Sequence, residues 1–179
     1  MFGYLIDKTE RYLKMMKKNY EKNYTPYGMP IFIVKDEIED EETGRKIPIV
    51  ISIIFPQSDK WVQIISPVLP LEELSKDDIF RIYELCLVLN NELADTAFEI
   101  DKDLNLLMIS NELHIDGFVY DVFEEEYEAI LQAILQFRKE VSKFIKNVDE
   151  LTKKGFEKLL RKFKYEEEGE DSSFYIDYQ

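Results

Sequence analysis

The chain has 179 residues, of which 37 are acidic and 23 basic, so its formal net charge is -14 at pH 7. A large nucleic-acid-binding surface needs clustered cationic side chains, so this excess of acid argues against binding DNA or RNA. Cys86 is the single cysteine, which excludes an intrachain disulfide and is typical of a reducing compartment. No signal-peptide pattern and no apolar run of 18 residues occurs, so we expect a cytoplasmic protein without stable membrane insertion.

The first predicted element is a helix over residues 2–23. Tyr4 or Leu5, Tyr12, and Met15 or Met16 fall roughly in line, and six Lys and Arg side chains surround them. A basic amphipathic helix can lie on an anionic membrane, but docking on its own domain is the favoured interpretation.

Three strand-like runs follow, over residues 30–38, 46–55 and 61–68. Gly44 can adopt a positive φ in the turn between the first two, which predicts a hairpin. The second run is apolar on both of its faces. Such a strand belongs inside a sheet that is covered on both sides, or covered on one side by a second subunit.

The stretch from residue 75 to 115 predicts a helix and then a hairpin. Ser75 and Asp78 mark the helix start, and Asn90 and Asn91 mark its end. Its buried face is expected to comprise Ile79, Ile82, Cys86, Leu89 and Leu93, widened by Phe80, Leu85 and Val88. Residues 94–101 and 104–115 then read as two antiparallel strands, joined by a turn around Lys102 and Asp103.

Apolar residues then recur at alternating spacings of four and three from Phe123 to Val148, which predicts a long helix with a continuous seam. Its aromatic residues favour packing on a sheet or in a groove over a coiled coil. We therefore expect an α+β fold with an antiparallel sheet of about five strands. Residues 1–148 would form one domain, 149–164 an appended basic helix, and 165–179 an acidic, flexible tail that could fold back on that helix.

This order of elements resembles the type III secretion chaperone-like fold and, within it, the YbjN family. The resemblance covers roughly residues 30–145 and is carried by Trp61–Pro70 with its SPVLPL ending, the helix end Leu87–Asn91, the strands Ala97–Asp101 and Leu106–Leu113, and the aromatic start of the helix that follows. It implies a homodimer without catalytic residues. Secretion chaperones of this fold hold a disordered segment of a partner protein on apolar surface.

Searching the sequence for chemistry predicts no catalytic residue, cofactor site or metal site. No phosphate-binding GxxxxGK[ST] motif occurs, and His114 is the single histidine, at a predicted strand end. The acidic run over residues 36–42 lacks the ligand spacing of an EF-hand loop, so a solvated hairpin tip is favoured.

Two function classes follow from these observations. The favoured class is a non-enzymatic protein-binding module, chaperone-like or regulatory, in which a homodimer holds a partner protein. The alternative is a small-molecule-binding domain or an enzyme with an unrecognised site. For the first class, the candidate partner or dimer surface comprises apolar residues of the strands and the long helix: Ile49, Ile51, Ile53, Trp61, Phe123, Tyr127 and Phe137.

Overall fold

A computed structural model describes all residues except 1, 25–27, 41–42, 56–59, 94–95 and 166–179. Its centre is a six-stranded antiparallel sheet with the strand order β1-β2-β3-β4-β6-β5. The α+β prediction is confirmed, with one strand more than expected. In chain order the elements are α1 (Phe2–Met15), β1 (Tyr20–Tyr24), β2 (Pro30–Asp40), β3 (Arg45–Ile54), β4 (Trp61–Pro70), α2 (Lys76–Glu92), β5 (Ala97–Asp101), β6 (Leu106–His114), α3 (Tyr120–Val141) and α4 (Val148–Tyr165).

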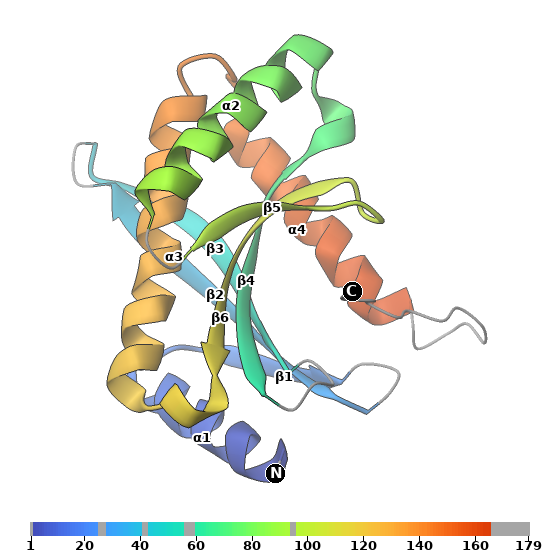
Figure 1. Ribbon diagram of the computed structural model, residues 1–179. Coiled ribbons are helices and arrows are strands. Elements are labelled where there is room, and N and C mark those ends of the chain that lie inside the picture. Colours follow the sequence, from blue (N-terminus) through green and yellow to red (C-terminus); the bar gives the residue numbers. More distant parts are fainter. Residues whose placement is uncertain (1, 25–27, 41–42, 56–59, 94–95, 166–179) are drawn as a thin grey trace.

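One face of the sheet is covered by α2 and α3, and α1 packs beside the start of α3 (Figure 1). The predicted seam of α3 faces the sheet, where Phe123, Tyr127 and Phe137 are fully buried. Each such side chain contributes roughly 1.5–3 kcal/mol by leaving water. The seam predicted from the sequence is therefore the centre of the chain's own core.

The helical seam does not run unbroken to Val148. α3 ends at Val141, and α4 begins at Val148 after a short turn. In that turn the Phe144 and Ile145 amides donate to the Val141 carbonyl. The periodic spacing continued through the turn because both helices bury apolar residues there.

The opposite face of the sheet is covered by α4, the helix expected as an appendage. Its Leu159 packs with Ile65, Leu106 and Met108 of β4 and β6. Gly155 allows this close approach, because a Cβ added there would lie 3.1 Å from the Leu106 Cδ1 atom. The two-faced strand β3 is thus part of a sheet with helices on both sides.

Strands β3 and β4 are paired at one end and diverge at the other. Among the described residues their register covers Ser52–Ile54 of β3 against Gln63–Ile65 of β4. Beyond this point the Ser66 hydroxyl donates to the Val50 carbonyl at 2.8 Å. Pro48, which has no amide hydrogen to donate, lies in the section of β3 without a β4 partner. The apolar residues Ile145, Val148 and Leu151 join the main core from the α3–α4 junction.

The first helix is shorter than predicted, and this prediction was wrong. α1 ends at Met15 because Lys17 has a φ of 57° and the Lys18 amide donates to the Leu13 carbonyl, which closes the helix. Tyr20–Tyr24 then forms the edge strand β1 against β2. Residues 16–23 contain no glycine or proline that would mark a helix end, so the sequence pattern predicts a helix up to residue 23.

The start of α2 and the turn between β2 and β3 agree with the prediction from the sequence. The Ser75 hydroxyl accepts from the Asp78 amide and caps α2, and Gly44 has a φ of 66°. Asn90 does more than mark the helix end. Its side-chain amide accepts from the Phe98 amide and donates to the Phe98 carbonyl, at 2.7 and 3.0 Å. It therefore pairs with the edge strand β5 as a short strand would.

We expect Lys17→Gly to stabilise the protein. A side chain in the left-handed region costs roughly 1–2 kcal/mol, and glycine avoids this cost. The free energy of unfolding should rise by about 1 kcal/mol, which corresponds to a Tm increase of about 2–4 °C in a chain of this size. Calorimetry measures this change. The control Lys14→Gly, in the last turn of α1, should lower stability by about 1 kcal/mol; a fall in both variants would contradict the assignment.

Candidate interaction surface

Six of the seven residues predicted for a partner or dimer surface are buried within the chain. Ile49, Ile51 and Ile53 of β3 point to the face covered by α3, and Phe123, Tyr127 and Phe137 of α3 meet that face. As they lie in this structure, these six side chains are inaccessible to a partner. An interaction surface must therefore be sought elsewhere, among the apolar side chains that remain exposed.

Trp61, the seventh residue, is partly exposed at the start of β4. Its ring packs edge-on against the ring of His114, with centroids 4.9 Å apart. The His114 Nδ1 atom accepts from the Asp116 amide at 3.3 Å. The sequence had placed His114 at a strand end, and it is indeed the last residue of β6. Its side chain therefore has a hydrogen-bond partner and a ring contact within the fold.

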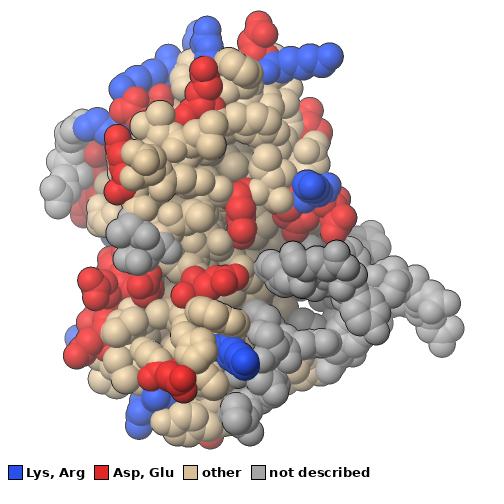
Figure 2. All heavy atoms as spheres, in the orientation of Figure 1, with Lys and Arg blue, Asp and Glu red and all other residues tan. Residues whose placement is uncertain are grey.

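Several large apolar side chains of α2 are exposed to water. Leu87, Phe80 and Tyr83 are 72%, 63% and 39% exposed. Since successive helix residues are about 100° apart, these three lie within a sector of about 60°. We call Phe80, Tyr83 and Leu87 the α2 stripe. Figure 2 shows tan surface in the area of α2, with acidic and basic side chains among it and around it.

The α2 stripe corrects a prediction made from periodicity. Phe80 and Val88 were expected to widen the buried face of this helix, but both are exposed, and the buried positions are Ile82, Cys86 and Leu89. The helix is apolar on nearly every side, so periodicity could not separate the face on the sheet from the face in water. A helix with more apolar residues than one buried face can hold is the feature of the sequence that could have indicated an interaction surface.

Another exposed apolar side chain lies on the edge strand of the sheet. Ile100 of β5 is exposed, and it points to the same side as Phe98, two residues earlier. Phe98 packs on Phe137 of α3, with ring centroids 5.1 Å apart. Ile100 is therefore on the side of the sheet where α2 lies, and Asn90 holds that helix against β5.

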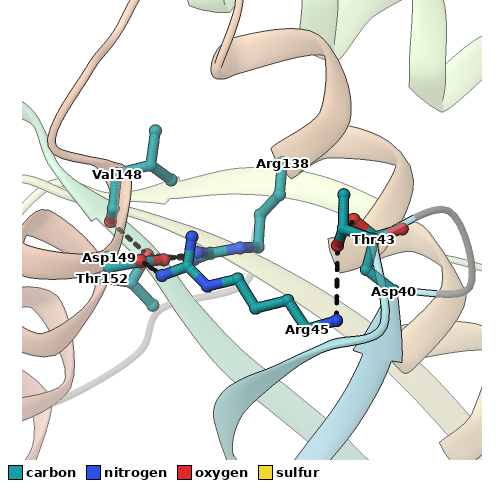
Figure 3. A network of polar contacts seen from close by, with 7 residues as sticks. All are labelled: Asp40, Thr43, Arg45, Arg138, Val148, Asp149 and Thr152. Carbon is teal, nitrogen blue, oxygen red and sulfur yellow. Dashed lines mark hydrogen bonds and ion pairs between the residues drawn. The ribbon is translucent and has the colours of Figure 1, made fainter.

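A network of ion pairs ties α4 to the rest of the fold (Figure 3). Arg138 of α3 bonds both Asp149 and Thr152 of α4, and Arg45 of β3 also bonds Asp149. The Arg138 side chain is only 9% exposed, whereas that of Arg45 is 63% exposed. Because every group in this cluster has a structural partner, we assign it to holding α4 across the gap between β3 and β4.

A second buried polar cluster joins three other elements. The Asp36 carboxylate of β2 accepts from Lys18 Nζ at 2.6 Å and from the Tyr127 hydroxyl at 2.9 Å. Burial, together with the negative charge of Asp36, raises the pKa of Tyr127. The tyrosine thus stays protonated and donates to the carboxylate, so this cluster fixes the end of α1 to β2 and α3.

The single thiol of the chain is buried, and acidic side chains of the run over residues 36–42 form ion pairs. Burial raises the pKa of Cys86 to about 12, which removes its nucleophilic form near neutral pH. The described residues contain no group of three His, Cys, Asp or Glu side chains that could hold a metal ion. Within the acidic run, Asp36 bonds Lys18 and Glu37 bonds Lys46, while residues 41 and 42 lie outside the described part.

Comparison with known proteins supports the fold alone. No protein-family model and no curated protein matches this sequence. The structure is similar to the crystal structure of an uncharacterized protein from Methanothermobacter thermautotrophicus, with a TM-score of 0.51 and 17% sequence identity, over 80% of this chain and 98% of that one. Among the described residues, no helix is long and apolar enough to cross a membrane.

We expect Asp149→Ala to destabilise the protein by about 3 kcal/mol, because it leaves the buried Arg138 guanidinium without a carboxylate. Arg45→Ala removes the exposed partner of the same carboxylate and should cost about 1 kcal/mol or less. Urea unfolding followed by circular dichroism measures both changes. Equal effects of the two substitutions would show that burial of Arg138 does not decide the stability of the network.

We expect Cys86 to react with a disulfide reagent about a hundredfold more slowly in the native protein than in urea at pH 8, because its pKa is near 12 rather than about 8.5 and the greater nucleophilicity of a basic thiolate offsets only part of this difference. The pH profile should also differ. The native rate should still rise about tenfold between pH 9 and 10, whereas the rate in urea should level off as the thiol ionises. A native rate that levels off near pH 9 would show an ordinary, accessible thiol.

Proposed function

We propose that this protein is a non-enzymatic protein-binding module that acts as a cytoplasmic homodimer and holds a segment of a partner protein, in a chaperone-like or regulatory role. The observation that carries the proposal is the α2 stripe, with Ile100 exposed on the same side of the sheet. Large apolar side chains gathered on one exposed helix face are favoured where another protein covers them. The single buried cysteine is compatible with a reducing compartment.

The size of the stripe suits the centre of an interface. Its two aromatic residues and one leucine, exposed to these extents, present roughly 300 Å² of apolar surface. A stable interface buries about 800 Å² on each partner and is apolar at its centre with a polar rim. The stripe would supply that centre, and the side chains flanking it on α2 and β5 would supply the rim.

The α2 stripe is self-complementary about a two-fold axis. Phe80 and Leu87 lie at equal distances along the helix from a point beside Tyr83, so an antiparallel second copy would place Phe80 of one chain against Leu87 of the other. A second copy therefore covers the exposed apolar positions of the helix.

The order of helices and strands along the chain supports a binding role. The meander β2-β3-β4, the helix α2, the hairpin β5-β6 and the long helix α3 follow one another as in the type III secretion chaperone-like fold that the sequence resembles. Secretion chaperones of that fold hold a segment of a partner protein, and we propose the same role for this chain. The inert thiol and the fully partnered ion-pair clusters favour this role over catalysis.

Leu87→Glu should convert the dimer into a monomer. The substitution puts two carboxylates into the apolar centre of the two-fold interface, where each loses hydration without gaining a partner. Sedimentation equilibrium at micromolar concentration should give twice 21.4 kDa for the unmodified chain and 21.4 kDa for the variant. A mass of 21.4 kDa for the unmodified chain would refute the homodimer.

Val88→Glu is the matched control, since Val88 is an exposed apolar residue on the same helix, about 100° away from Leu87. This variant should remain dimeric. If Val88→Glu dissociates the protein and Leu87→Glu does not, a different face of α2 forms the interface. In addition, Tyr83→Cys should crosslink to itself across the two-fold axis, whereas Val88→Cys should not.

A further inference from the structure

The helix α1 presents cations and exposed apolar side chains in one line. Tyr4, Lys8, Arg11 and Met15 follow each other at spacings of four, three and four, so they form a single row along the outer side of the helix. We call these four residues the α1 row. Its ends are apolar and open to water, because Tyr4 is 66% and Met15 is 52% exposed.

Several cations of this helix have no carboxylate partner among the described residues, although the chain is strongly acidic. Lys18 bonds Asp36 and Lys22 bonds Glu10. Among the described residues, the structure shows no ion pair for the remaining cations of this region, Lys8, Arg11, Lys14 and Lys17. In a chain with a net charge of -14, this concentration of cations within residues 8–17 is a departure from the overall charge pattern.

Aromatic rings hold two of these cations in position. Lys8 Nζ lies 5.0 Å from the centre of the Tyr4 ring and 5.9 Å from that of Phe118, and the Arg11 guanidinium lies 5.7 Å from that of Tyr12. A cation next to an aromatic face keeps its hydrogen-bond donors free. The α1 row thus combines ordered donors for carboxylates with apolar contacts at either end.

We propose that the α1 row binds an acidic segment of a partner protein that carries aromatic residues among its carboxylates. Lys8 and Arg11 bond the carboxylates, and Tyr4 and Met15 contact the rings. The row is about 16 Å long and one side chain wide, which fits one extended segment of about five residues. Lys14, toward the C-terminal end of the helix, adds attraction along the flank.

A membrane surface fits these observations less well. Two exposed apolar side chains give little anchoring, and a flat anionic bilayer would also face the acidic remainder of the chain. A peptide contacts the row alone. At physiological ionic strength, charges more than about 8 Å away are largely screened, so the local cations decide the attraction.

The site is separate from the α2 stripe. α1 and α2 lie at opposite ends of the molecule in Figure 1. The dimer and this binding site therefore succeed or fail independently, and sedimentation of each variant shows whether a change in binding comes with a change in mass.

The test uses the full chain and the fluorescein-labelled peptide GEYEEEYEEG, whose two tyrosines are four residues apart. Fluorescence anisotropy should show binding that weakens as NaCl rises from 50 to 300 mM. Lys8→Glu with Arg11→Glu should weaken binding at least tenfold. The control Lys153→Glu with Arg161→Glu makes the same charge change at two exposed positions of α4 and should alter affinity less than twofold.

Further arms separate the alternatives. The milder pair Lys8→Gln with Arg11→Gln, checked for an unchanged Tm, should also weaken binding, and Tyr4→Ala with Met15→Ala should reduce the preference for this peptide over its tyrosine-to-serine version. Equal losses in the α1 and α4 charge variants would overturn the proposal in favour of general electrostatics. Binding of phosphatidylserine vesicles or of single-stranded oligothymidine without binding of the peptide would overturn it in favour of a lipid or nucleic-acid surface.

Discussion

The packing of α3 against the sheet is the constraint on which the rest of the structure depends. The helix buries an aromatic seam along most of its length, and Phe123, Tyr127 and Phe137 are inaccessible to water. α1 and α2 take positions on either side because they pack on what α3 leaves uncovered: Tyr12 meets Phe118, Tyr120 and Phe123, and α2 closes over Phe98 and β5. Because the apolar face of α3 is buried against the sheet, the apolar surface that remains available to partners lies on the helices around it.

The divergence of β3 and β4 explains why α4 is part of the fold. A sheet that opens at one end leaves backbone groups and core side chains uncovered, and three kinds of residue meet this need. Ser66 bonds the Val50 carbonyl, Pro48 needs no partner for its nitrogen, and Leu151 fills the core from α4. Arg138 and Asp149 fix the helix at that position. A buried ion pair adds little net stability relative to an apolar contact, but it penalises any other placement of α4 strongly.

Elements with regular periodicity or a strong capping signal could be predicted from the sequence. The α3 seam, the Ser75 cap and the Gly44 turn depend on interactions between residues close in sequence, so the residue types alone predict them. The end of α1 could not be predicted, since it rests on Lys17 in a left-handed conformation that its residue type disfavours. The exposed side of α2 could not be predicted either, because Phe80 and Val88 have the same apolar character as the buried residues beside them. Which face an apolar helix turns to the sheet depends on the sheet's own shape, and that is tertiary information.

The two surfaces left open differ in chemistry, and this difference limits what each can recognise. The α2 stripe is apolar and self-complementary, so its affinity would come from area and would be insensitive to salt. The α1 row is cationic with apolar ends, so its affinity would come from charge and would fall as salt rises. Because charges more than about 8 Å away are largely screened, an acidic segment would be attracted to this acidic chain only where cations are ordered at close range, as Lys8 and Arg11 are beside Tyr4 and Tyr12. Such a surface selects against weakly matched acidic proteins, because attraction begins only after the segment reaches the row itself.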